Sequence, residues 1–412
     1  MKGRPLTCLK LRVTWFGVAL LSLAFGSSCN SSSSSKKEGL ASPGGSNSIL
    51  GAGSTFVYPI MTRWISEFQR VNSNSEVQIN YQSMGSGGGI QQLKQGLVDF
   101  GASDAPLDDE RLKEMPALLQ IPESAGPVCI AYNLPELKNP LKLSATTLSR
   151  IFLGQIKTWQ DPAIKKDNPG SVLPNYPVVV THRSDGSGTT SIFTSYLAKV
   201  SPEWAKQVGT GISVSWPAGL GGKGSEGLTG VIKLTPGAIG YVELTYAKHY
   251  GLSVAQVRNQ AGTWRDPTPA GATAAIEAFA EKLAQDVRTP IVDPPASARD
   301  AYPICGLTYL LVTKDGRDAK KRAAVKSFVQ YILTDGQTFA ETLSYARLQP
   351  GWQTRTKTCW ARYLRMDGRF RAFYLRRSKL VKPFLVREPL TLMAPAALSW
   401  KIQGRARQVK FP

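Results

Sequence analysis

The sequence predicts an α/β fold, because a short strand, a loop rich in Gly, Ser and Thr, and a helix follow one another three times within the 412 residues. The three loops read GAGSTF (51–56), GSGGG (85–89) and RSDGSGTT (183–190). Each is placed to open a helix, whose first N–H groups lack internal partners and carry about half a positive charge. Three such loops with few Lys or Arg nearby predict an oxyanion site built mainly from neutral donors, at the carboxyl ends of strands.

Hydrophobic periodicity predicts the elements around these loops. The helix after the first loop has Ile60, Trp64, Ile65 and Phe68 on one face, and the helix after the second loop is expected to contain Ile90, Leu93 and Leu97. In chain order, the predicted elements are a helix over 58–71, a strand over 77–81, the helix with Ile90, a strand end running into a turn over 99–106, a strand over 177–182 and a helix over 191–200.

The net charge of +21 is concentrated at the two ends of the chain. The first 28 residues hold four basic residues and no acid, and residues 347–412 hold 16 basic and two acidic residues, which leaves +3 for the body 29–346. A nucleic-acid-binding body needs a basic face, so the composition gives no support for a nucleic-acid partner.

The N-terminal segment 1–28 has the pattern of an export signal. Four basic residues precede the apolar run VTWFGVALLSLAF and a stretch of small residues. Cys29 follows these small residues as at a lipoprotein cleavage site, which makes it the candidate lipidation site; ordinary cleavage nearby is the alternative. Residues 29–47 are rich in Ser and Gly and are expected to form a flexible tether. We therefore expect a periplasmic or other extracytoplasmic location, with a lipid anchor if Cys29 is modified.

The cysteines and histidines offer little for catalysis. Cys129 and Cys305 lie in strand-like contexts in the body and can form either a disulfide or two buried thiols. No cluster of Cys and His has metal-ligand spacing, so no metal and no cofactor are expected. His182 lies near Asp185 and Ser187, but we interpret it as a structural residue at a strand end. The sequence predicts a binding protein and not an enzyme.

The motifs identify a family. In order and spacing, GAGSTF, NYQSMGSGGG, VDFGASDAPL, IFLGQIKTWQDP, RSDGSGTTSIFTSYL, GGKGSEG and GAIGYVE closely resemble the PstS family, the phosphate-binding proteins of bacterial high-affinity phosphate ABC transporters. The resemblance covers about 48–346. It implies a two-lobed periplasmic-binding-protein fold of type II, with crossing strands and the anion in the cleft between the lobes. The implied limits are 48–132 plus 303–346 for lobe one and 133–302 for lobe two.

The resemblance also implies the ligands. Backbone N–H groups and hydroxyl groups of two loops of lobe one are expected to face an Arg and a helix N-terminus of lobe two. Ser54, where Ala is common in the family, and Asp185 are expected beside the site. The expected phosphate ligands are Thr55, Phe56, Ser86, Asp104, Arg183, Ser187, Gly188 and Thr189.

Asp104 carries the expected selectivity. An ionised Asp only accepts hydrogen bonds, so it repels an anion that has no proton to donate. Phosphate at neutral pH carries a P–OH group and sulfate does not, so Asp104 is expected to reject sulfate. The alternative is that Asp104 only caps the turn at Pro106. Arg183 is likewise expected to form an ion pair with Asp185 while it contacts the anion.

These residues predict a monomer that binds inorganic phosphate and delivers it to the membrane permease of an ABC transporter. A binding protein for another tetrahedral oxyanion such as arsenate is one alternative, since arsenate also carries a proton. A surface or adhesion protein that reuses the fold is another.

The resemblance stops after Ala346. The family usually continues with a short final helix, whereas residues 347–412 are basic, contain Cys359 and have no clear helical period. We interpret this segment as a frameshift product or as disordered chain, because codons for its first residues, read two nucleotides later, can encode a family-like ending. A genuine basic tail that binds anionic lipid or nucleic acid is the alternative.

Overall fold

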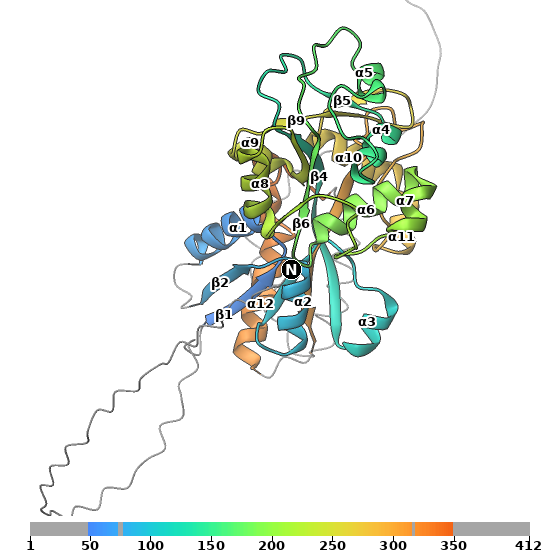
Figure 1. Cartoon of the computed structure of the whole chain (residues 1–412). Coiled ribbons are helices and arrows are strands. Elements are labelled where there is room, and N and C mark those ends of the chain that lie inside the picture. Colours follow the sequence, from blue (N-terminus) through green and yellow to red (C-terminus); the bar gives the residue numbers. More distant parts are fainter. Residues whose placement is uncertain (1–47, 73–76, 315–317, 349–412) are drawn as a thin grey trace, which may run out of the picture. The chain divides into compact units, whose positions relative to one another are not determined.

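The computed structural model describes residues 48–72, 77–314 and 318–348 (Figure 1), which all belong to one compact unit, Gly45–Pro412. The expected export signal, the lipidation site Cys29, the tether 29–47 and nearly all of the tail lie outside these residues. Among the described helices, none is long and apolar enough to cross a membrane.

Two sheets contain the described strands. The large sheet consists of β1 (Ser48–Gly53), β2 (Gln78–Ser83), β3 (Phe100–Ser103), β4 (Leu118–Tyr132), β6 (Val179–Arg183), β7 (Leu220–Gly222), β8 (Ala238–Glu243), β9 (Ser253–Val254) and β12 (Cys305–Thr313). Its order is β2-β1-β3-β12-β4-β8-β6-β7, and β9 also pairs with β4. The small sheet consists of β5 (Lys142–Leu143), β10 (Gln256–Arg258) and β11 (Trp264–Arg265).

The helices surround these sheets (Figure 1). They are α1 (Tyr58–Val71), α2 (Ser86–Lys94), α3 (Asp109–Glu114), α4 (Ala145–Phe152), α5 (Pro162–Asp167), α6 (Gly188–Val200), α7 (Pro202–Gln207), α8 (Gly224–Leu234), α9 (Leu244–His249), α10 (Pro269–Ala278), α11 (Ala280–Gln285) and α12 (Ala319–Ile332). The short 3₁₀ helices η1 (Asp335–Phe339) and η2 (Glu341–Leu343) follow α12.

The long strand β4 joins the two lobes. Residues 118–127 pair with β12, and residues 128–132 pair with β8, in both cases antiparallel. On the β12 side the parallel strands β1, β2 and β3 form the sheet of the first lobe, and on the β8 side the parallel strands β6, β7 and β8 form that of the second. The chain therefore crosses between lobes in β4 and returns in β12. The residue limits given above for each lobe stay predictions.

The helix predicted over 58–71 is confirmed as α1. Its buried residues Ile60, Trp64 and Phe68 recur at helical spacing, and the Phe68 ring packs edge-on against Phe328 of α12, with the ring centroids 5.3 Å apart. This apolar stripe is what the sequence pattern revealed.

The second helix differs from its prediction. Gly87, Gly88 and Gly89 of the second loop are themselves helical, because α2 begins at Ser86. Leu97 lies beyond the end of α2 with 60% of its surface exposed. A Cβ on Gly89 would lie 2.3 Å from the Cα of Gly53, so glycine is needed there for α2 to pack against β1. Close packing outweighs the low helix propensity of glycine.

Both cysteines of the body are buried free thiols, so no disulfide joins Cys129 of β4 to Cys305 of β12. The Cys305 thiol donates to the carbonyl oxygen of Tyr302, 3.3 Å away. Burial raises the pKa of both thiols, which keeps them protonated and unreactive.

The last described residues pack onto the first lobe. Ala346 bridges Ala125 of β4, and the N–H of Leu348 donates to Oε1 of Gln337 at 3.0 Å. Leu348 is buried although it belongs to the predicted tail 347–412. The origin of that tail stays a prediction, since its remaining residues lie outside the described part.

Candidate anion-binding site

The first loop turns sharply where β1 ends. Gly53 has φ +142°, and a Cβ there would lie 2.1 Å from the carbonyl oxygen of Ala102, so the loop requires glycine. Thr55 and Phe56, which follow, are buried. The N-cap of α1 is Val57, whose N–H donates to the Ser54 hydroxyl at 3.3 Å, so the helix begins at Tyr58 as predicted.

The second and third loops place donors at true helix starts. Gly85 is the N-cap of α2 with φ +87°, and Ser86 is the first residue of that helix. Ser187 is the N-cap of α6, and its hydroxyl accepts from the N–H of Thr190 at 3.1 Å. Gly188 and Thr189 form the first turn of α6, and the N–H groups at the start of a helix favour an anion.

Hydrogen bonds bring the loops of the two lobes together. The Ser86 hydroxyl oxygen accepts from the N–H of Asp104 and from the N–H of Gly188, both at 3.2 Å. The N–H of Gly87 donates to the carbonyl oxygen of Gly186 at 2.8 Å. Residues from all three loops and from the turn after β3 therefore lie around one point.

Asp104 is buried between these loops and does not cap the turn at Pro106. The hydroxyl of Ser103 does so, since it donates to the carbonyl oxygen of Ala105 at 2.6 Å and accepts from its N–H at 3.1 Å. Oδ1 of Asp104 accepts from the Ser54 hydroxyl instead. Burial raises the pKa of Asp104 to about 7, against the opposing effects of the Ser54 hydrogen bond, of Arg183 and of Ser86.

Arg183 and Asp185 form a bidentate ion pair on the opposite side. Nε of Arg183 lies 2.7 Å from Oδ1 of Asp185, and the second bond, between an Nη and Oδ2, measures 2.5 Å. Oδ1 also accepts from the N–H of Gly224 at 2.9 Å. Burial favours the neutral acid, but the hydrogen bonds and charge of Arg183 hold the pKa of Asp185 below its ordinary value. The pair is therefore nearly neutral as a unit.

Thr189 offers a donor that the described residues leave unused. Its hydroxyl oxygen is fully buried and has no hydrogen-bond partner within 48–72, 77–314 and 318–348. A buried hydroxyl without a partner is costly. An anion held at the start of α6 would supply the acceptor.

Two further residues belong to this cluster, and the sequence analysis did not single them out. The hydroxyl oxygens of Ser225 and Thr55 lie 2.7 Å apart, and the Ser225 hydroxyl oxygen lies 3.2 Å from Oε2 of Glu243. An Nη of Arg183 donates to the Ser225 hydroxyl at 3.4 Å. Ser225 lies in GGKGSEG and Glu243 ends GAIGYVE, so the family motifs contained both residues.

The histidine near the third loop has a structural role. The ring of His182 stacks on Trp216 with centroids 4.9 Å apart and an interplanar angle of 11°. Its Nδ1 lies 3.0 Å from the carbonyl oxygen of Arg183. In the described ranges, no group of three or more His, Cys, Asp or Glu residues could hold a metal ion.

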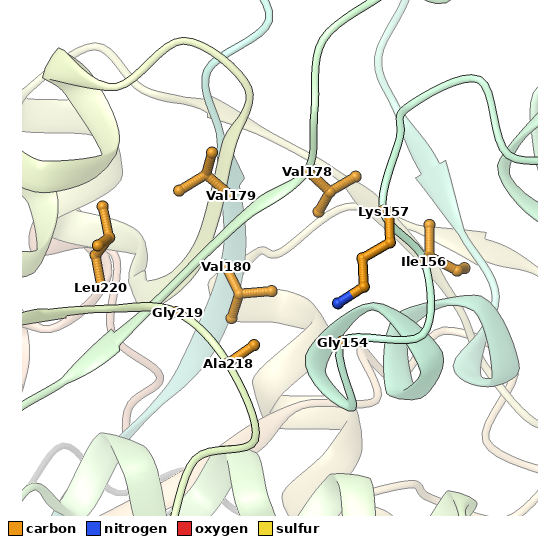
Figure 2. A pocket seen from close by; sticks show the side chains of 9 residues that line it. All are labelled: Gly154, Ile156, Lys157, Val178, Val179, Val180, Ala218, Gly219 and Leu220. Atoms are coloured by element: carbon orange, nitrogen blue, oxygen red, sulfur yellow. The ribbon is translucent and has the colours of Figure 1, made fainter. Parts of the chain in front are cut away.

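A separate pocket lies beside β6 in the second lobe (Figure 2). It has a volume of about 220 Å³ and is lined by residues 178–180, Leu220 and Lys157, among others. None of the expected ligands contributes to its wall, so it is distinct from the cluster around Asp104 and Arg183.

Comparison with known proteins places the chain in a family. The family model described as a PBP superfamily domain matches residues 40–336. The phosphate-binding protein PstS of Xylella fastidiosa is 40% identical over 314 residues, which cover 76% of this chain and 85% of the relative. The protein of the same name from Haemophilus influenzae is 39% identical over 315 residues, with coverage of 76% and 92%.

A crystal structure of a phosphate ABC transporter substrate-binding protein with bound phosphate, from Clostridium perfringens, has a similar fold. The TM-score is 0.53 at 18% identity, and the match covers 74% of this chain and 100% of the other. The sequence matches extend well beyond the loops to most of both chains. The protein described here belongs to the PstS family of phosphate-binding proteins, within the PBP superfamily.

Proposed function

We propose that this protein binds inorganic phosphate outside the cytoplasm and delivers it to the membrane permease of an ABC transporter. The observation that carries the proposal is the buried set of neutral donors from both lobes, which surrounds one carboxyl group and one arginine. The unpartnered Thr189 hydroxyl supports a ligand at this point. Family membership supports the same conclusion.

The geometry supports a ligand role for residues of both lobes. Thr55 and Ser86 donate hydroxyl and N–H groups from the first lobe, and Phe56 donates its N–H. From the second lobe, Ser187, Gly188 and Thr189 donate at the start of α6. Arg183 donates from the guanidinium edge that Asp185 leaves free.

Asp104 is the group that selects among anions. Ser54 occupies Oδ1, and the other carboxyl oxygen is available to a ligand that brings a proton. Phosphate and arsenate bring one at neutral pH, whereas sulfate does not. A site built for a particular hydrogen bond can reject a ligand that lacks it by about 10⁴-fold.

The remaining assignments complete the proposal. The protein acts as a monomeric periplasmic carrier, anchored to the membrane if Cys29 is lipidated. It makes and breaks no covalent bond, since binding and closure of the lobes need only hydrogen bonds and charge.

Equilibrium dialysis of the phosphate-stripped protein against radiolabelled phosphate tests this proposal. We expect saturable retention of one phosphate per protein, competition by arsenate and none by sulfate or molybdate. Folded protein that retains no phosphate would contradict the assignment of the ligand. Competition by sulfate as strong as that by arsenate would contradict the role of Asp104.

A further inference from the structure

We propose that Glu243 is a positioning residue for the anion site: as a neutral acid it orients the Ser225 hydroxyl, which in turn orients the Thr55 hydroxyl to donate to the anion. This inference rests on the proposed function, since Thr55 is assigned there as a phosphate ligand. It makes phosphate affinity depend on the protonation of a residue that does not touch phosphate.

A continuous chain of three side chains carries the inference. Glu243 is the last residue of β8, Ser225 lies in the first turn of α8 and Thr55 follows β1. Oε2 of Glu243 is 3.2 Å from the Ser225 hydroxyl oxygen, which is 2.7 Å from that of Thr55. All three residues are buried, so water does not compete for these bonds.

An ionised Glu243 orients this chain away from the anion. A carboxylate can only accept, so Ser225 must donate to it. Each hydroxyl has a single proton, and therefore Ser225 must accept the proton of Thr55 at the 2.7 Å contact. Thr55 then presents only lone pairs to the anion, which repel it.

A neutral Glu243 allows every bond of the chain to be reversed. Its O–H donates to Ser225, Ser225 donates to Thr55, and the Thr55 hydroxyl is free to donate to the anion. Ser225 has two lone pairs, so it also accepts from Arg183 in either orientation. The two orientations thus differ only in the direction of the hydrogen bonds and need no movement of heavy atoms.

The surroundings of Glu243 favour the neutral acid. Oε1 is buried and has no hydrogen-bond partner among the described residues, and the side chain does not cap α9 although Glu243 is its N-cap. Burial is the largest influence, and it raises the pKa of Glu243 well above its ordinary value although Arg183 and the Ser225 hydrogen bond oppose this. The titratable or charged groups that face Glu243 are Arg183 of β6, Asp104 after β3, Cys129 of β4, Tyr246 of α9 and Tyr345.

The competing explanation is plain charge repulsion between ionised Glu243 and the anion. Repulsion acts through space and needs neither Ser225 nor Thr55, whereas the chain needs both hydroxyls. Substitution of either hydroxyl therefore separates the two explanations.

Phosphate affinity measured by calorimetry between about pH 5 and 9.5 provides the test. In Glu243→Gln the amide can donate to Ser225 at every pH, so the phosphate affinity of this variant should equal that of wild type at low pH. It should exceed that of wild type by about tenfold to a hundredfold at high pH, the effect of one hydrogen bond to a charged group. Glu226→Gln is the matched control, because Glu226 lies next to Ser225 in sequence, its Oε1 accepts from the Tyr246 hydroxyl at 2.6 Å, and the chemical substitution is the same.

The same comparison in a Ser225→Ala background decides between the explanations. The chain is then interrupted, so Glu243→Gln should no longer change the pH profile, and Thr55→Val should abolish the difference in the same way. Equal profiles of wild type and Glu243→Gln, or a difference that persists in Ser225→Ala, would overturn the inference. Wild-type protein that binds no phosphate at any pH would instead refute the proposed function.

Discussion

Two aspartates on opposite sides of the candidate site have opposite electrostatic environments. Asp104, from the first lobe, lies beside the Ser54 and Ser86 hydroxyls, and burial raises its pKa to about 7. Asp185, from the second lobe, is held in a bidentate ion pair, and Arg183 keeps its pKa below the ordinary value. The same side chain thus becomes a group that can change its protonation in one lobe and a fixed counter-charge in the other.

The different environments of Asp104 and Asp185 suit two different roles in anion binding. In the proposed site, the second lobe neutralises charge: Arg183 would attract the anion, and Asp185, paired with it, would limit the attraction of other anions. The first lobe is proposed to sense the proton on the ligand, because Ser54 bonds only Oδ1 of Asp104 and no ion pair with Asp104 is seen among the described residues. The following experiments test this division, from the largest expected effect to the smallest.

Loss of the arginine should have the largest effect. Arg183→Ala removes the cation and leaves the half-buried Asp185 unpaired beside the anion, so phosphate affinity should fall by about 100-fold to 1000-fold. Calorimetric titration measures the loss. The double variant Arg183→Ala/Asp185→Ala should recover part of it, since the repelling charge is gone; a double variant weaker than the single one would show that Asp185 does not act as a counter-charge.

Conversion of the first-lobe acid to an amide should change selectivity. The amide of Asp104→Asn can donate a hydrogen bond, so sulfate affinity should rise by about 100-fold or more. Competition between sulfate and radiolabelled phosphate measures the change. Asp108→Asn is the control, because Asp108 is exposed and only caps α3, where it accepts from the N–H of Arg111. Unchanged sulfate rejection in Asp104→Asn would remove Asp104 from the selectivity mechanism.

Lower pH should weaken the rejection of sulfate, as is expected of Asp104→Asn. Asp104 with a pKa of about 7 is ionised at about pH 8 and neutral at about pH 5.5, where its O–H can donate to sulfate. Sulfate should therefore begin to compete as the pH falls through about 7, while sulfate itself does not titrate in this range. In Asp104→Asn, sulfate should compete with phosphate equally at about pH 8 and about pH 5.5. If sulfate competition in the wild type did not depend on pH, the titration of Asp104 would not control the rejection of sulfate.

Removal of the hydroxyl beside Asp104 should have the smallest effect. The Ser54 bond stabilises the ionised form of Asp104, so Ser54→Ala should raise the pKa of that carboxyl and move the onset of sulfate competition to higher pH. Phosphate affinity should change by less than about tenfold. Ser83→Ala, which removes a buried hydroxyl without a partner among the described residues, is the control. An onset at lower pH would contradict the assigned direction of the bond.

The sequence predicted those features that local patterns encode. The bounds of α1 follow from its apolar stripe, and the pairing of Arg183 with Asp185 follows from two residues close in the chain. The helical state of the glycines in α2 depends on contact with β1, which no local pattern contains. Ser225 and Thr55 are 170 positions apart, so only the fold reveals that their hydroxyl groups meet.

Ser54 illustrates the same limit within the site. From the sequence it was a small change beside the ligands, whereas in the structure its hydroxyl donates to the carboxyl that is proposed to select the anion. The bond joins residues 50 positions apart. Propensity and spacing identified the loops, and the three-dimensional contacts determine which hydroxyl groups donate to which acceptors.

Calorimetric titration of the phosphate-stripped protein at about pH 8, with phosphate and then with sulfate, tests the central claim most directly. The account predicts one phosphate bound per protein, with tight saturation, and no heat from sulfate. Binding of both anions with similar affinity, or of neither by a folded sample, would contradict it.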